Sequence, residues 1–226
     1  HVQTGFVGLA SVDEYLNGDI KKHEHTRPEK VNDRVRLIKT LNAQTGPVFL
    51  AYKQTEEMAD LVKVLLDKSI KMYDFVSYHD VRHIFYKVDY EPFNTQIQEA
   101  FAKLESLYIA DGHHRSEGAS MYCKSKRDEM NDISSAAPFC SFLTVTFPDS
   151  DMMILPYNRA VQDLNGHSGE ELLQKIAEKF EINVAPDFAG VKESKSFGMY
   201  LNGEWHLLTA KPEIIENDAV KSLDVS

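Results

Sequence analysis

One stretch, Ser106 to Ala119, constrains the fold more than any other, because it predicts a change from strand to helix across a single tight turn. Leu107 to Ala110 form an apolar run typical of a short buried strand, and Asp111 and Gly112 interrupt it. Gly112 lacks a Cβ, so it can adopt a positive φ or let a ligand approach the backbone closely. Ser116 to Cys123 are compatible with a helix. The stretch therefore predicts strand, turn and helix in direct succession.

The same turn carries the chemistry of an anion site. A helix that opens directly after a glycine leaves backbone N–H groups free at its positive end, where an anion is favoured. His113, His114 and Arg115 fall in this turn, and a guanidinium can bind two phosphate oxygens at once. Strand-to-helix turns with glycine are also common as purely structural elements. Two imidazoles and a guanidinium directly after Asp-Gly favour an anion or phosphate site.

A second polar segment, His23-Glu24-His25-Thr26, comes directly before a predicted helix. Thr26 to Glu29 have the form of a capping box, with Thr26 as the N-cap, Pro28 in the first turn and Glu29 at the third helical position. The helix places apolar residues on one stripe and Lys30 with Arg34 on another face. The stripe comprises Val31, Val35, Ile38 and Leu41.

Glu24 has two possible roles on this reading. It could be a salt-bridged surface group, or it could be a general base that takes a proton from a hydroxyl beside a bound phosphate. The residues alone leave both roles open.

These two segments resemble known families. Ile-Ala-Asp-Gly-His-His-Arg, followed by a helix of small residues, is similar to the signature of the ParB/sulfiredoxin superfamily, and especially of its free L-serine kinases. The longer pattern of His-Glu-His-Thr, then Lys30, Asp33 and Arg34, then Asp-Gly-His-His-Arg, resembles an uncharacterised prokaryotic family of unknown function, DUF1015. That likeness spans Gln3 to Ser226, whereas the kinase likeness rests on two short motifs.

The resemblance implies a set of roles. The turn from Asp111 to Arg115 (Asp111, Gly112, His113, His114, Arg115) would hold nucleotide phosphates, Lys30 and Arg34 would neutralise charge, and Glu24 would activate the serine hydroxyl. His23, His25, Thr26 and Arg159 are further candidates for contact with the ligand. Sulfiredoxin chemistry needs a cysteine in the phosphate motif, and this chain has histidines there.

A protein-ligated transition metal is not expected. Four histidines could suggest one, but adjacent histidines do not easily bind one tetrahedral ion, and the spacing matches no zinc template. The four are His23, His25, His113 and His114. If ADP or ATP binds, the expected metal is Mg²⁺ held mainly by the nucleotide phosphates.

The alternation of patterns along the chain predicts an α+β fold, a mixed sheet flanked by helices, with a ParB/sulfiredoxin-like core over residues 1–148 and a second α/β subdomain over 149–226. The second part carries a strand over Met152 to Pro156, a helix capped by Ser168 and a hairpin around Asn202-Gly203, a strong turn signal. The opening at His1 and the end at Ser226 suggest a fragment of a longer protein.

Composition narrows the function classes. The net charge of −10 argues against duplex DNA as the main ligand, although it leaves room for a local basic patch. No apolar run approaches the ~20 residues that span a bilayer, and no signal peptide is visible. Cys123 and Cys140, the only two cysteines, predict buried thiols in a reducing cytoplasm.

Three hypotheses of function remain from the sequence. The leading one is a phosphotransferase that acts on a small hydroxyl compound such as free serine. The others are a nucleotide-binding switch or DNA-associated module, and a structural protein with a vestigial site. The sequence indicates no oligomeric state.

Overall fold

The structure is a computed structural model that describes residues 1–131, 134, 137–153, 155 and 158–215. The chain forms two compact units, His1–Ile154 and Leu155–Ser226. Asp149 and Asp151 belong to the first unit, where their carboxylates accept hydrogen bonds from the backbone N–H groups of Gln54 (2.9 Å) and Thr4 (3.0 Å). The division therefore falls a few residues later than residue 148.

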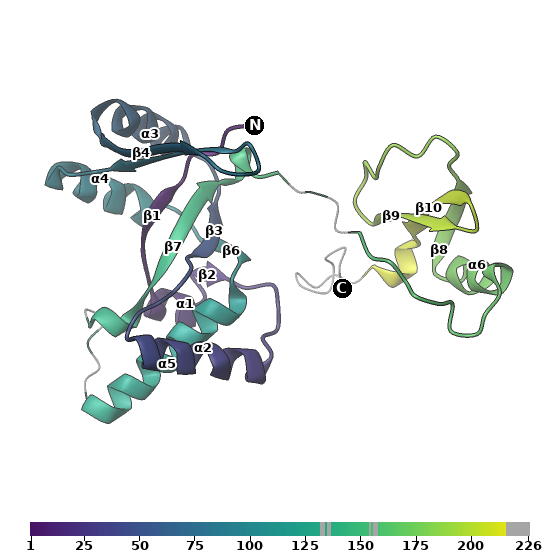
Figure 1. Cartoon of the computed structure of the whole chain (residues 1–226), viewed down its shortest axis with the longest axis horizontal. Coiled ribbons are helices and arrows are strands. Elements are labelled where there is room, and N and C mark those ends of the chain that lie inside the picture. The colour runs from purple at the N-terminus through teal and green to yellow at the C-terminus, as the bar shows by residue number, and fades with distance from the viewer. Residues whose placement is uncertain (132–133, 135–136, 154, 156–157, 216–226) are drawn as a thin grey trace. The chain divides into compact units, whose positions relative to one another are not determined.

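The first unit is built on a five-stranded mixed sheet (Figure 1). Its strands, in spatial order, are β1 (Phe6–Ser11), β7 (Ser141–Pro148), β3 (Val48–Tyr52), β6 (Leu107–Asp111) and β2 (Ile20–Lys21). The pairs β1–β7 and β3–β6 are antiparallel, and the pairs β7–β3 and β6–β2 are parallel. The predicted α+β fold with a mixed sheet flanked by helices is confirmed.

Three helices pack together against this sheet (Figure 1): α1 (Val12–Asn17), α2 (Pro28–Leu41) and α5 (His113–Met130). Two further helices, α3 (Glu56–Lys68) and α4 (Glu91–Ala102), pack on each other and form a second apolar cluster with Tyr52. The hairpin β4 (Ile70–Val76) and β5 (Arg82–Lys87) forms a separate two-stranded sheet.

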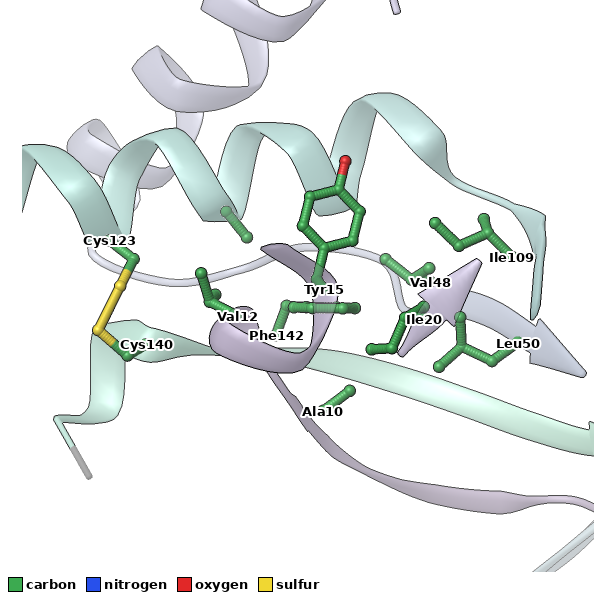
Figure 2. Packing of buried hydrophobic residues seen from close by; sticks show 11 residues of the cluster. Ala10, Val12, Tyr15, Ile20, Val48, Leu50, Ile109, Cys123, Cys140 and Phe142 are labelled. Atoms are coloured by element: carbon green, nitrogen blue, oxygen red, sulfur yellow. A yellow bond between two sulfur atoms is a disulfide. The ribbon is translucent and has the colours of Figure 1, made fainter. Parts of the chain in front are cut away.

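The main core lies between α1, α5 and the sheet (Figure 2). Tyr15 of α1 packs edge-on against Phe142 of β7, and both side chains are almost fully buried. Burial of such aromatic side chains supplies much of the stability of a domain of this size.

The prediction of two separate thiols is wrong. Cys123 of α5 and Cys140, at the end of the short 3₁₀ helix η1 (Pro138–Cys140), form a disulfide across 5.1 Å between their Cα atoms. Both residues belong to the main core (Figure 2). The folding of η1 back onto α5 brings the cysteines together, and this tertiary contact leaves no pattern in the sequence.

The second unit holds a three-stranded antiparallel sheet in the order β8 (Phe180–Val184), β10 (Glu204–Ala210) and β9 (Ser196–Leu201), with helix α6 (Gly169–Ala177). Ser168 and Glu171 form the predicted capping box of α6. Asn202 (φ 50°) and Gly203 (φ 91°) form the predicted hairpin turn. Of the strand expected over Met152 to Pro156, Met152 and Met153 lie outside any helix or strand, and Ile154 and Pro156 lie outside the described residues.

Two short 3₁₀ helices, η2 (Asp149–Asp151) and η3 (Pro212–Ile214), complete the regular elements of the described residues. Among these residues, none of the helices combines the length and the apolar character needed to cross a membrane.

Candidate functional site

The sheet topology brings the two polar segments together. β2 and β6 are parallel neighbours, with Ile20 beside Leu107 and Lys21 beside Tyr108. Both strands therefore end at the same edge of the sheet, where ligands of α/β proteins commonly bind. Glu24 follows the end of β2, and Gly112 follows the end of β6.

Gly112 makes the turn from β6 into α5. Its backbone is left-handed (φ 103°, ψ 25°), and a Cβ at this position would lie 3.0 Å from Nε of Arg115. The carbonyl of Gly112 accepts the first helical hydrogen bonds, from the N–H groups of Arg115 and Ser116. Within the described residues, no acceptor takes the N–H groups of His113 and His114. These N–H groups form part of the positive end of the helix dipole, which attracts an anion.

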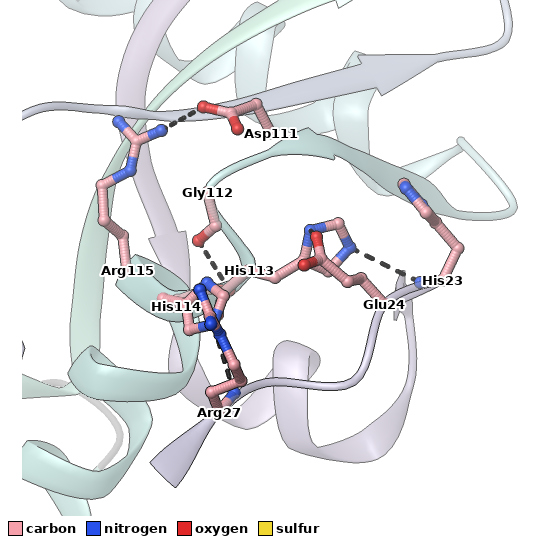
Figure 3. A network of polar contacts seen from close by, with 9 residues as sticks. His23, Glu24, Arg27, Asp111, Gly112, His113, His114 and Arg115 are labelled. Carbon is pink, nitrogen blue, oxygen red and sulfur yellow. Dashed lines mark hydrogen bonds and ion pairs between the residues drawn. The ribbon is translucent and has the colours of Figure 1, made fainter. Parts of the chain in front are cut away.

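The two histidines of the turn hold the segment that carries Glu24 (Figure 3). Nε2 of His113 accepts a hydrogen bond from the backbone N–H of His23 at 3.5 Å, and Nε2 of His114 accepts one from the backbone N–H of Arg27 at 3.2 Å. The ring of His23 also packs edge-on against that of His113, with centroids 4.5 Å apart. Consecutive residues of α5 thus fix both ends of the segment from His23 to Arg27.

These contacts define the protonation of His113. Burial of its side chain, which is 3% exposed, and the neighbouring His23 lower the pKa of His113. The ring is therefore neutral near pH 7. Because Nε2 accepts the N–H of His23, the single proton belongs on Nδ1. Nδ1 lies 3.3 Å from Oε2 of Glu24, whose side chain stays 56% exposed.

The predicted cap of α2 is wrong by one residue. Arg27 is the N-cap (φ −88°, ψ 125°), Pro28 is the first helical residue, and no side chain caps the helix. A proline disfavours the helical conformation in the residue before it, so Arg27 must stay extended and the helix cannot begin earlier. Glu29 then falls at the second helical position, and a capping box cannot form. Thr26 is half-buried and has no capping role.

Close packing of α2 on α5 sets the position of Lys30 and Arg34. A Cβ built on Gly118 of α5 would lie only 2.8 Å from Cβ of Arg34. The absence of a side chain at Gly118 therefore lets α2 approach at this point. This role of Gly118 was not predicted from the sequence, although a glycine inside a helix of small residues is a usable signal of close helix contact.

These elements enclose an open cleft of about 510 Å³. The cleft is lined by Glu24, Glu29, Lys30, Asp33, Arg34, Asp111, Gly112, His113, His114 and Arg115. The structure thus brings the predicted Glu24, Lys30, Arg34 and the whole turn from Asp111 to Arg115 to one place. The sequence analysis did not anticipate Glu29 as a lining residue.

The cleft holds more carboxylates than fixed cations. Asp33 binds Arg34 at 2.9 Å and Arg36 at 2.8 Å, so part of the charge of Arg34 is already neutralised. Lys30 has no ion-pair partner in the part of the chain that the structure describes. The positive groups available to an anionic ligand are therefore the ammonium group of Lys30, the partly neutralised guanidinium of Arg34 and the backbone N–H groups of the turn.

Arg115 differs from its predicted geometry. Its Nη1 donates to the carbonyl of Pro47, and its Nη2 donates to Oδ2 of Asp111 (Figure 3). The guanidinium thus ties the turn to the start of β3. Its bidentate grip on phosphate, expected from the sequence, would require these two partners to be exchanged for phosphate oxygens.

Two remaining candidates, His25 and Thr26, lie outside the cleft lining. His25 is exposed, and Thr26 is half-buried. Arg159 belongs to the second unit, so the site of the first unit is described without it.

Comparison with known proteins supports the predicted membership of one family. No curated protein and no solved structure matches the chain. A protein family described as "Protein of unknown function (DUF1015)" matches residues 1–226. Because the match covers the whole sequence with both polar segments of the cleft, the chain belongs to the DUF1015 family.

Proposed function

We propose that the protein is a phosphotransferase. A nucleotide, ADP or ATP, binds with its phosphates at the turn from Asp111 to Arg115, and a small hydroxyl compound such as free serine accepts the phosphoryl group. Glu24 acts as the general base toward the acceptor hydroxyl. Lys30 and Arg34 offset the negative charge of the phosphates.

One observation carries this proposal: the carboxylate of Glu24 lies at the N-terminus of α5, 3.3 Å from Nδ1 of a buried neutral histidine. A neutral neighbour does not cancel the negative charge of a carboxylate, so Glu24 can still accept a proton. The open N–H groups of His113 and His114 offer a place for phosphate next to it. Glu24 and these two residues line one cleft, which supports the pairing of a base with a phosphate site.

The donor set of the cleft suits magnesium carried in by the nucleotide. Mg²⁺ prefers oxygen ligands and commonly combines one or two carboxylates with substrate phosphates. Glu29 and Asp111 are exposed carboxylates of the lining that could supply such a ligand. Among the described residues, no group of three or more potential ligands could hold a metal ion by itself. Bound Mg²⁺ would neutralise phosphate charge during transfer.

The test is a transfer assay on the whole chain, with labelled ADP or ATP and serine or other small alcohols. Glu24→Gln keeps the shape of the side chain but cannot take a proton near neutral pH. We expect it to bind nucleotide as the wild type does and to lose transfer by about 10²–10⁴-fold. The matched control is Glu56→Gln, an exposed glutamate in the first turn of α3 and outside the cleft, which should transfer at the wild-type rate.

Each other outcome has a defined meaning. Wild-type rates in Glu24→Gln would remove Glu24 as the base. Tight nucleotide binding without transfer to any acceptor would favour a nucleotide-binding switch. Failure of ADP, ATP and inorganic phosphate to bind would refute the phosphate site itself.

A further inference from the structure

The hairpin β4–β5 is an isolated and strongly exposed element. All seven residues of β4 are exposed, including Tyr73 (62%), Phe75 (54%) and Val76 (61%). Among the described residues, β4 and β5 pair only with each other, so the outer edge of each strand has no strand partner. A two-stranded hairpin alone is marginally stable in water, and an exposed apolar edge is a template for further pairing.

The sequence of β4 is complementary to its own antiparallel copy. Met72 is bulged out of the ladder with β5. When the other residues of Ile70 to Phe75 are aligned antiparallel with themselves, Ile70 lies opposite Phe75, Lys71 opposite Asp74 and Tyr73 opposite its own copy. Apolar residues thus face apolar or aromatic residues, and each cation faces a carboxylate. Cross-strand pairs of these kinds stabilise antiparallel strands.

The outer edge of β5 lacks this property. β5 is regular, so a two-fold axis can place only residues of one face opposite each other, for example Arg82 opposite Tyr86 and His83 opposite Phe85. β5 contains no carboxylate, so no cation of one copy could face a carboxylate of the other. The charge pattern therefore distinguishes the two edges of the hairpin and selects β4.

The charges of β4 are held in place for such a contact. Asp74 accepts hydrogen bonds from Nε and Nη2 of Arg82, both at 2.8 Å, and from Nζ of Lys71 at 3.0 Å. Hydrogen bonds from Arg82 and Lys71 hold the pKa of Asp74 far below its usual range, so the carboxylate stays charged at any physiological pH. The contact between Lys71 and Asp74 also shows that these two side chains lie on the same face of the strand.

We propose that the protein forms a two-fold symmetric dimer in which the β4 edges of two copies pair antiparallel. The two hairpins then form a continuous four-stranded sheet, and Lys71 of each copy faces Asp74 of the other. The pairing of β4 with β5 is irregular between Lys71 and Tyr73, which leaves Met72 as an extra residue. The ladder between copies therefore leaves Met72 out and places Tyr73 of each copy opposite the other at the symmetry axis.

Sedimentation equilibrium of the whole chain tests the dimer, because a single chain has a mass of 25.7 kDa. We expect the wild type to reach twice this mass at micromolar concentration. Lys71→Asp and Asp74→Lys should each weaken association at least tenfold, since symmetry places two like-charge contacts in every dimer. An equal mixture of the two variants should associate again. In the mixed dimer the two substituted side chains face each other with opposite charges, and the native Asp74 of one variant faces the native Lys71 of the other.

The control is Lys87→Asp on β5, which should leave the dimer unchanged. A marked change of association in this variant would instead point to the β5 edge. Circular dichroism of each variant verifies that it is folded. The proposal is overturned if the wild type is still monomeric at 100 times the micromolar concentration. It is also overturned if Lys71→Asp leaves the dimer intact, or if the two variants do not associate when mixed.

Discussion

Replacement of Gly118 by alanine tests the contact that positions α2 over the cleft. The new Cβ would lie 2.8 Å from Cβ of Arg34, whereas carbon atoms in contact normally lie about 3.5–4.0 Å apart, so α2 must withdraw by roughly 1 Å. Overpacking of this kind costs about 1–3 kcal/mol. Alanine in place of glycine inside a helix gains about 1 kcal/mol. We therefore expect the free energy of unfolding of Gly118→Ala to fall by about 0–2 kcal/mol.

The matched control is Gly8→Ala in β1, where a new Cβ meets no atom within 4 Å. This substitution should stabilise the protein by about 0.4–1 kcal/mol, because it restricts only the unfolded chain. Urea unfolding followed by far-ultraviolet circular dichroism measures both variants. The single tryptophan, Trp205, lies in the second unit, and its fluorescence reports that unit separately. A stabilisation of Gly118→Ala as large as that of Gly8→Ala would refute the close approach of α2.

Three further changes probe the same unit. Arg115→Ala should weaken nucleotide binding by about 1.5–3 kcal/mol in calorimetry and also lower the melting temperature, because Arg115 holds Asp111 and Pro47; unchanged affinity would remove Arg115 from the phosphate site. Because the pKa of His113 is lowered in the folded chain, this histidine binds a proton more readily in the unfolded chain than in the folded one. The free energy of unfolding should thus be constant above about pH 6.5 and fall as the pH drops below it. His113→Gln should flatten this dependence, and an equally steep profile in the variant would assign it to other groups. Mass spectrometry after alkylation without reductant should find no free thiol, and reduction of the Cys123–Cys140 bond should destabilise the unit by about 3 kcal/mol; two alkylated cysteines would contradict the disulfide.

The parts of the fold that local chemistry controls could be predicted from the sequence. Asn202-Gly203 permits a positive φ at both turn positions, so the hairpin of the second unit was evident. At the start of α6, the Ser168 hydroxyl accepts a hydrogen bond from the backbone N–H of Glu171, and the Glu171 carboxylate accepts one from the backbone N–H of Ser168. The Asp-Gly break at residues 111 and 112 marked the change from β6 to α5. In each case the signal and its structural effect lie within a few residues.

The parts that depend on distant contacts could not be predicted in this way. The partner of the Arg115 guanidinium is the carbonyl of Pro47, which the sequence gives no reason to place nearby. The role of His114 is a hydrogen bond from the backbone of Arg27, so its side chain serves the opposite segment. At Thr26, two local rules competed, and the restraint imposed by Pro28 prevailed over the capping-box pattern.

The place of β1 in the sheet has a consequence for biosynthesis. β1 is an edge strand whose only neighbour among the described strands is β7, with Phe6 beside Thr146. During translation at about 5–20 residues per second, the nascent β1 thus waits on the order of ten seconds for its partner. Its residues Val7 and Leu9 remain exposed even in the folded chain. The sheet of the first unit therefore closes late, and the nascent chain carries an unpaired apolar strand for most of the synthesis of that unit.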